Sequence, residues 1–253
     1  MSYGNLQGRV CFVAGASSGM GRRSALALAE AGARVVVAAR RKSLCDDLAA
    51  DIVRAGGDAL ALELDGTDPA SAQATIDAID SHYGRLDGVF NNLGHTFGHG
   101  AFDETPLERW HDTLSVNLTA VFYLLRAEIP LLLRSGGGAI VNNSSTGGLQ
   151  GVRAMADYSA AKWGVIGLTR SVALEYADRQ IRCNVIAPGI IATEKFEEFR
   201  AQSPEIFEQL QKDIPSQQFG DMQDIAAAVV WLLSSASRYI NGATIPIDAG
   251  RTA

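Results

Sequence analysis

The chain has 253 residues, of which 47% are apolar and 20% are charged, and this ordinary globular composition excludes disordered, collagen-like and coiled-coil classes. At this length folding buries roughly 70% of the unfolded chain's surface, so one domain with a sizeable core is expected. The net charge of −6 argues against a nucleic-acid binder and against docking on anionic membranes.

Cysteine usage and the start of the chain point to a reducing compartment. The chain has three cysteines, an odd number, at the widely spaced positions Cys11, Cys45 and Cys183. This pattern suits neither a disulfide framework nor a zinc site. The opening MSYGNLQGRV has no apolar core of a secretory signal. The most apolar stretch, 121–133, is interrupted by charges and a proline and is too short to span a bilayer. We expect a soluble cytoplasmic protein with no nucleic-acid or membrane partner.

Short β-branched runs alternate with helical patterns along the whole chain. The expected strands are Arg9–Ala14, Arg34–Ala39, Ala59–Leu64, Gly88–Asn91, Ala139–Asn143, Arg182–Ile186 and Thr244–Ile247. The expected helices are Arg22–Ala31, Leu44–Ala55, Ala70–His82, Thr119–Leu133, Ala156–Ala177 and Asp221–Ser234. This alternation predicts an α/β fold, a doubly wound parallel sheet of about seven strands with helices on both faces. Ligands of such sheets bind beyond the carboxyl ends of the strands.

The first strand runs into a glycine-rich turn, Gly15-Ala16-Ser17-Ser18-Gly19-Met20-Gly21, from which a helix begins. Such a turn lets backbone N–H groups approach a phosphate, and the helix N-terminus adds positive potential. The same residues spell Gly15-x-Ser17-x-Gly19, the nucleophile elbow of serine hydrolases, but no strand precedes this one as that elbow requires. A P-loop is excluded because the turn contains no lysine.

The end of the second strand suggests which dinucleotide binds. An NAD site usually has an acidic residue there for the ribose 2′-hydroxyl, whereas this strand ends at Ala39 and continues with Arg40 and Arg41. A guanidinium suits a 2′-phosphate because it forms two parallel hydrogen bonds with it. We therefore expect NADP(H), with NAD(H) as the alternative.

Tyr158 and Lys162 lie one helical turn apart near the start of a long helical pattern, so their side chains share a face. A phenol with a pKa near 10 is a poor base at neutral pH. An ammonium about 4 Å away, at an effective dielectric constant near 20, would stabilise the phenolate by about 4 kcal/mol and lower that pKa. Tyr158 is thus a candidate proton donor and acceptor for an alcohol or carbonyl, and Ser144-Ser145 follows an apolar strand at the same sheet edge.

These features together resemble the short-chain dehydrogenase/reductase family, in its branch of about 250 residues. The resemblance covers nearly the whole chain and implies a single Rossmann-like domain. It rests on Ala14–Gly21, Leu64-Asp65, Asn91-Asn92-Leu93-Gly94, Asn117, Ser145, Tyr158–Lys162 and Pro188-Gly189 with Thr193. The family pattern departs at Leu93, where alanine is usual, and at Gly66, where a branched residue is usual.

The resemblance implies a role for each matching residue. Tyr158 would be the general acid/base, and Lys162 would lower its pKa and hold the nicotinamide ribose. Ser145, rather than Ser144, would bind the substrate oxygen, and Asn117 would hold a water that relays protons through Lys162. The expected cofactor contacts are Gly15, Ser17, Ser18, Gly19, Met20, Gly21, Arg40, Arg41, Asp65, Gly66, Asn91, Gly94, Tyr158, Lys162, Pro188, Gly189, Ile191 and Thr193.

The function expected from the sequence is hydride transfer between NADP(H) and a small-molecule carbonyl or alcohol. The alternatives are a non-catalytic dinucleotide-binding regulator on the same fold and a serine hydrolase that uses Ser17. No metal site is expected, because the glycines around His95 and His99 disfavour a helix that would bring both rings to one ion. The segment 190–214 is expected to form a substrate lid, and the family resemblance implies a homotetramer, with a dimer as the alternative. The sequence does not identify the substrate.

Overall fold

The computed structural model describes residues 4–202 and 204–253 of the chain. Within these residues seven strands form one parallel sheet, in the order β3-β2-β1-β4-β5-β6-β9. The strands are β1 (Val10–Ala14), β2 (Arg34–Ala39), β3 (Asp58–Glu63), β4 (Gly88–Asn91), β5 (Gly138–Asn143), β6 (Ile181–Pro188) and β9 (Thr244–Ile247). The predicted doubly wound sheet is confirmed, and the observed strand ends differ from the expected ones by at most two residues.

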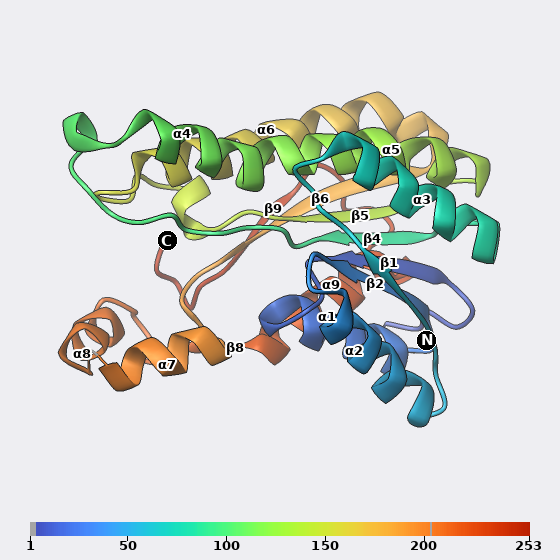
Figure 1. Cartoon of the computed structure of the whole chain (residues 1–253), viewed down its shortest axis with the longest axis horizontal. Coiled ribbons are helices and arrows are strands. Elements are labelled where there is room, and N and C mark those ends of the chain that lie inside the picture. Colours follow the sequence, from blue (N-terminus) through green and yellow to red (C-terminus); the bar gives the residue numbers. More distant parts are fainter. Residues whose placement is uncertain (1–3, 203) are drawn as a thin grey trace.

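Helices cover both faces of the sheet (Figure 1). They are α1 (Gly19–Glu30), α2 (Lys42–Arg54), α3 (Pro69–Tyr83), α4 (Leu107–Leu114), α5 (Ala120–Arg134), α6 (Ala156–Tyr176), α7 (Glu194–Gln202), α8 (Pro204–Lys212) and α9 (Met222–Leu233). One layer contains α3, α4, α5 and α6, and the opposite layer contains α1, α2 and α9 (Figure 1). Helix α4 was not predicted from the sequence, because it is only eight residues long.

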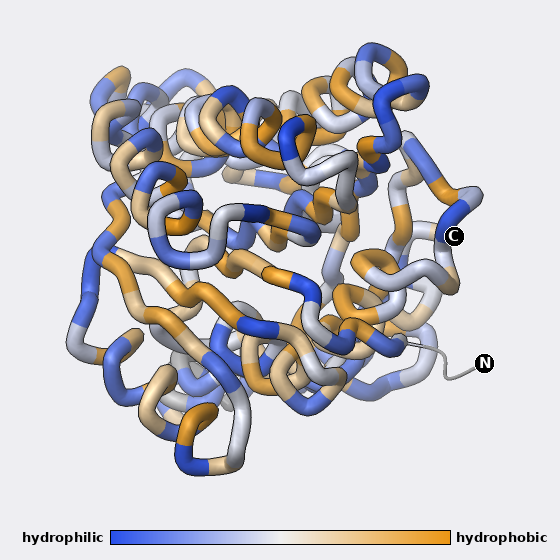
Figure 2. The backbone as a smooth tube through the Cα atoms, turned by 90° about the vertical axis from the view of Figure 1, so that its right-hand side faces the viewer, coloured by the Kyte–Doolittle hydropathy of each residue, from blue (hydrophilic) through white to orange (hydrophobic). Residues whose placement is uncertain are grey.

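The sheet separates two hydrophobic cores. Val10, Phe12 and Val36 face one layer, whereas the alternate residues Cys11 and Val13 face the other. This division follows from the strand geometry, because successive side chains point to opposite faces. Hydrophobic residues accordingly predominate along the central strands (Figure 2), which are buried on both faces as in other parallel sheets.

The continuous helical stretch 107–134 is longer than the helix predicted over Thr119–Leu133. A π-helical turn, Ser115–Thr119, joins α4 to α5 without a break. By length and composition this stretch could cross a membrane, but 56% of its apolar window is buried inside the fold, as is typical of a core helix. Single π-helical turns often mark functional positions, and this one contains Asn117.

Helices α7 and α8 stand apart from the two layers at one end of the molecule (Figure 1). They follow the two-residue strand β7 (Ile191–Ala192), which pairs with β8 (Gly220–Asp221) outside the main sheet. Phe196 of α7, Phe207 of α8 and Phe219 pack as edge-to-face rings, with centroids 4.6 to 6.3 Å apart. The two helices therefore pack on one another through a small aromatic cluster.

Candidate active site

A cavity of about 1190 Å³ opens along the carboxyl ends of the strands. It extends from the turns after β1 and β2, past the end of β4, to the turns after β5 and β6. The strand order reverses between β1 and β4, and doubly wound sheets bind their ligands at such a reversal. Most residues expected to contact a cofactor line this cavity: Gly15, Ser17, Ser18, Gly19, Met20, Arg40, Arg41, Asp65, Gly66, Gly94, Tyr158, Lys162, Pro188, Gly189 and Thr193.

The glycine-rich turn offers a phosphate site at the start of α1. Ser18 is the N-cap residue, yet its side chain makes no capping hydrogen bond, and the first turn carries no acidic residue. The N–H groups of Gly15 and Ala16 donate to the carbonyl of Ala38, whereas no side chain caps the first turn of α1, whose N–H groups can therefore bind an anion. Gly15 has a φ of +78°, and a Cβ there would lie only 3.0 Å from the carbonyl oxygen of Asn92. A side chain at Gly15 would disrupt the turn that presents these groups.

Arg41 extends from the end of β2 to the same turn. Its Nη2 atom donates hydrogen bonds to the hydroxyls of Ser17 and Ser18, each at 2.9 Å. Hydrogen bonds from Thr67 are the main cause that lowers the pKa of Asp65, and the charge of Arg40, which also lines the cavity, lowers it a little further. This end of the cavity thus carries two guanidinium groups next to the uncapped helix.

Two of the departures from the family pattern, at Gly66 and Leu93, compensate one another. A Cβ at Gly66 would lie 2.2 Å from Cδ1 of Leu93, so a branched residue at position 66 would collide with the leucine. Both residues line the cavity. The larger side chain at position 93 therefore occupies the space that the glycine leaves open.

Ser145 and Tyr158 lie together at the other end of the cavity. Both line it, and the Ser145 hydroxyl is hydrogen-bonded with the phenol of Tyr158. The Ser145 hydroxyl also accepts a hydrogen bond from the N–H of Gly147 at 3.1 Å, which holds it in place. Ser144 instead donates to the backbone carbonyl of Lys162 at 2.9 Å and is buried. The structure thus places the Ser145 hydroxyl, and not that of Ser144, beside the phenol, and the expected contact of Ser145 with a substrate oxygen stays a prediction.

Lys162 lies beside Tyr158, with its Nζ atom 5.6 Å from the centroid of the phenol ring. Nζ donates to the backbone carbonyl of Asn143 at 3.0 Å. Burial lowers the pKa of Lys162 to about 8. Burial also raises the pKa of Tyr158, against the smaller lowering by Ser145. The phenol pKa is therefore raised in the protein alone and not lowered as predicted, because burial disfavours the charged form of the phenol.

Asn117 is completely buried beneath the loop that follows β4. Its Oδ1 accepts a hydrogen bond from the N–H of His95, and its Nδ2 donates to the carbonyls of His95 and Thr113. A Cβ at Gly94 would lie 3.1 Å from Oδ1 of Asn117 and 3.2 Å from Nζ of Lys162. The glycine therefore leaves a gap between the amide and the ammonium.

Three expected cofactor contacts lie outside the cavity lining. Asn91 is fully buried and donates to Glu128 at 3.1 Å and to Asn142 at 3.0 Å, because alternation along the strand turns it away from the site. Gly21 packs against the backbone of Gly15, since a Cβ there would lie 2.2 Å from that carbonyl oxygen. Ile191 lines a separate, smaller cavity beside β8.

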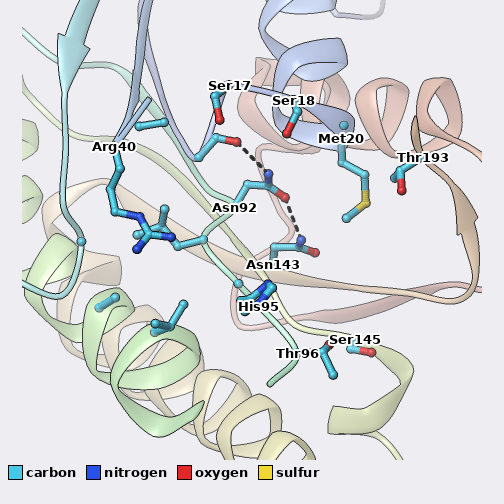
Figure 3. A pocket seen from close by; sticks show the side chains of 18 of the residues that line it. Ser17, Ser18, Met20, Arg40, Asn92, His95, Thr96, Asn143, Ser145 and Thr193 are labelled. Carbon is cyan, nitrogen blue, oxygen red and sulfur yellow. Dashed lines mark hydrogen bonds between the residues drawn. The ribbon is translucent and has the colours of Figure 1, made fainter. Parts of the chain in front are cut away.

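Several cavity residues were not predicted as cofactor contacts, and two of them connect the lysine to the glycine-rich turn. Asn143 donates to Oδ1 of Asn92 at 2.8 Å, and Asn92 donates to the carbonyl of Gly15 at 3.2 Å (Figure 3). The others are Arg22, Ala39, Leu64, Thr67, Leu93, His95, Thr96, Val116, Ala120, Ser144 and Glu194. Most of them lie at or just after the end of a strand, which does not tell which side chains turn inward, and Arg22, Val116 and Ala120 lie on helices.

These groups fit a phosphate-bearing dinucleotide. The uncapped α1 terminus and two arginines suit its phosphates. A phenol, a hydroxyl and an ammonium then meet at the opposite end, where a proton can be exchanged with a substrate oxygen. Among the described residues no group of three or more His, Cys, Asp or Glu side chains could hold a metal ion.

Comparison with known proteins agrees with this geometry. Residues 15–252 match a family model described as enoyl-(acyl carrier protein) reductase. The chain is 36% identical over 244 residues to cyclohexanol dehydrogenase of Acinetobacter sp. (strain SE19), covering 96% of this chain and 95% of that protein. It is 34% identical over 252 residues to levodione reductase of Leifsonia aquatica, covering 97% and 94%.

A solved structure shows the same fold with a cofactor bound. It is described as a putative 2-deoxy-D-gluconate 3-dehydrogenase from Agrobacterium tumefaciens with bound NADP. It superposes with a TM-score of 0.89 at 36% identity and covers 99% of both chains. With its fold, its site and its relatives in agreement, the chain belongs to the short-chain dehydrogenase/reductase family of oxidoreductases.

Proposed function

We propose that this protein is an NADP(H)-dependent oxidoreductase that interconverts a small-molecule alcohol and its carbonyl, with Tyr158 as the general acid/base. The observation that carries this proposal is one cavity with Ser145, Tyr158 and Lys162 at one end and Arg40 and Arg41 at the other. The relatives support the reaction type, because the names of the two curated proteins describe them as a dehydrogenase and a reductase.

In this mechanism a bound nicotinamide supplies or accepts the hydride. The Ser145 hydroxyl holds the substrate oxygen beside the phenol of Tyr158. In reduction the phenol donates its proton to that oxygen, and in oxidation the phenolate removes it. Lys162 would hold the nicotinamide ribose, and a water that relays protons would lie between Lys162 and Asn117, beside Gly94.

The preference for NADP(H) rests on the arginines. Arg41 is already ordered by its hydrogen bonds to Ser17 and Ser18, and Arg40 lies in the same part of the cavity. Strand β2 ends at Ala39 with no carboxylate to bind a ribose 2′-hydroxyl. The NADP-bound relative supports the same choice.

The test is a screen of carbonyls and alcohols that follows the absorbance of the reduced nicotinamide, with cyclohexanol and levodione included because relatives are named for them. In Tyr158→Phe we expect turnover to be lost while NADPH still binds, as measured by cofactor fluorescence. Binding of NADPH by the wild-type protein without turnover of any compound would favour the regulator. Ester hydrolysis lost in Ser17→Ala would favour the hydrolase.

The proposal includes a substrate lid and a homotetrameric assembly. The segment 190–214 is a lid, supported by Thr193 and Glu194 at the cavity wall and by the separate position of α7 and α8 (Figure 1). NADPH should therefore slow limited proteolysis of this segment, and equal rates with and without NADPH would refute the lid.

The assembly is a homotetramer, supported by large apolar side chains that are exposed on helices of one layer. Leu107 of α4, Phe122 of α5 and Trp163 of α6 are 78%, 48% and 51% exposed. Light scattering at micromolar concentration should give four times the monomer mass, and a monomeric mass would refute assembly. The cytoplasmic location stays a prediction.

A further inference from the structure

A buried ion pair lies directly beside the proposed acid/base. Nε of Arg109, on α4, donates to Oδ2 of Asp157 at 3.0 Å, and Asp157 immediately precedes Tyr158 in the first turn of α6. The two side chains are only 10% and 3% exposed. Among the ion pairs formed by the described residues, this is the one in which both partners are so deeply buried.

The carboxylate of Asp157 has partners on two helices. The hydroxyl of Thr113, one turn after Arg109 on α4, donates to the same Oδ2 atom at 2.9 Å. Burial alone would raise the pKa of Asp157. Hydrogen bonds from Thr113, from the N–H of Tyr158 and from Arg109 lower it by more, so the net pKa is below its usual value and the carboxyl group is ionised at neutral pH. The carboxylate thus joins α4 to the backbone N–H of the tyrosine itself.

Arg109 also supports the loop that borders the cavity after β4. Its Nη2 atom donates to the hydroxyl of Thr105 at 3.0 Å. A Cβ at Gly100 would lie 3.3 Å from Nη1, and a Cβ at Gly98 would lie 3.9 Å from Cδ, so the loop backbone rests on the arginine side chain. The N–H of Gly100 donates to the carbonyl of Ala154 at 3.0 Å, which joins this loop to the segment before α6.

The energetics favour a role in positioning over a role in overall stability. Apolar residues of similar volume often stabilise a fold as well as a buried ion pair does, because the pair loses hydration. Nη2 of Arg109 also lies 3.5 Å from Oδ1 of Asp157, and such a two-point guanidinium–carboxylate contact restricts geometry more tightly than apolar packing does. The pair joins the two segments that border the proposed substrate end, since His95 and Thr96 of the loop and Tyr158 of α6 all line the cavity.

We propose that Arg109 and Asp157 are positioning residues: the pair holds the first turn of α6, and with it the Tyr158 phenol, in register with the loop 95–100. This inference rests on the proposed function, in which Tyr158 exchanges the proton. Neither residue is among the cavity-lining residues, so the pair acts through Tyr158 and the loop.

The test compares Arg109→Gln with Arg85→Gln. Arg85 also pairs with a buried carboxylate, that of Asp87, which accepts hydrogen bonds from Arg9 and from the N–H of Val10. That cluster lies at the amino ends of β1 and β4, at the opposite edge of the sheet from the cavity. Both substitutions should lower the melting temperature, so the comparison separates stability from positioning.

In Arg109→Gln we expect kcat/KM for the substrate to fall by about tenfold or more, because misplacement of a reacting group by about 1 Å costs about a hundredfold. The Kd for NADPH, measured by fluorescence, should change by less than about twofold, which corresponds to about 0.4 kcal/mol. Arg85→Gln should keep the wild-type kcat and KM. Wild-type kcat and KM in Arg109→Gln, with only its melting temperature lowered, would overturn the proposal.

A second readout does not require turnover. Alkaline absorbance titration of the protein, minus that of Tyr158→Phe, isolates the ionisation of Tyr158. In Arg109→Gln this ionisation should shift by about half a pH unit or more, because displacement of the phenol changes its burial and its hydrogen bond with Ser145, the two causes that set its pKa. An unchanged titration in Arg109→Gln would overturn the positioning role even if no substrate is found. If the wild-type protein turns over no substrate but the titration shifts in Arg109→Gln, the positioning role stands and only the proposed reaction is refuted.

Discussion

The Nζ atom of Lys162 lies 5.6 Å from the centroid of the Tyr158 ring and donates its hydrogen bond to the carbonyl of Asn143. Burial disfavours charge on both groups: it lowers the pKa of Lys162 to about 8 and raises that of Tyr158. A neutral phenol suits proton donation during reduction. In oxidation the phenolate must form against this burial, so the hydrogen bond from Ser145 matters most in that direction.

The first prediction concerns Ser145 and the pH dependence of oxidation. Oxidation should rise with pH as Tyr158 ionises, and Ser145→Ala should move this limb to higher pH, because the serine hydrogen bond favours the phenolate. The measurement is kcat/KM for alcohol oxidation against pH. Ser144→Ala is the control, since its hydroxyl donates to the backbone of Lys162. If kcat/KM for oxidation rose at the same pH in Ser145→Ala as in the wild type, Ser145 would not be the group that stabilises the phenolate of Tyr158.

The second prediction concerns cofactor preference. Arg41→Gln should weaken NADPH binding by about 10- to 100-fold, the range expected when a charge-assisted pair with a phosphate is lost. NADH binding should change little, because NADH has no 2′-phosphate. Arg54→Gln, at the exposed far end of α2, is the matched control and should behave as wild type with both cofactors. Equal weakening for NADPH and NADH would show that Arg41 does not read the 2′-phosphate.

The third prediction uses the gap beside Lys162. In Gly94→Ala the new Cβ would lie 3.2 Å from Nζ of Lys162 and 3.1 Å from Oδ1 of Asn117, so both groups must shift. We expect kcat to fall by about tenfold or more, with a small change in melting temperature. Gly151→Ala is the control, since a Cβ there meets nothing within 4 Å. Full activity in Gly94→Ala would argue against a relay through this gap.

The fourth prediction concerns the buried carboxyl of Glu128. Burial raises its pKa to about 8, against a smaller lowering by the hydrogen bond from Asn91. The folded state therefore binds more protons than the unfolded state between about pH 4.5 and 8, and this group makes stability fall as pH rises through that window.

Glu128→Gln removes this penalty and keeps a similar shape, so the free energy of unfolding at pH 8 should rise by on the order of 2 kcal/mol. Urea unfolding at pH 5 and pH 8 measures the effect, which should be small at pH 5. The exposed Glu175→Gln should change neither value. A loss of stability at pH 8 in Glu128→Gln would mean that the carboxylate is the form the fold prefers.

Local patterns were enough to predict the strands, the glycine-rich turn and the Tyr158–Lys162 pair. Each depends on neighbours within a few residues: β-branched runs favour strands, glycine allows the turn at Gly15, and a four-residue spacing places two side chains on one helical face. Because parallel strands end at one edge, the same patterns also located the cavity.

Packing between distant segments decided what the sequence could not. Asn91 and Asn92 are adjacent, yet only Asn92 turns into the cavity, and Arg109 meets Asp157 across 48 positions of the chain. The raised pKa of Tyr158 has the same origin, because desolvation depends on all the elements that surround the phenol. Local patterns in the sequence thus predicted which side chains gather at the cavity. Long-range packing decided which partners these side chains contact, and burial decided their protonation.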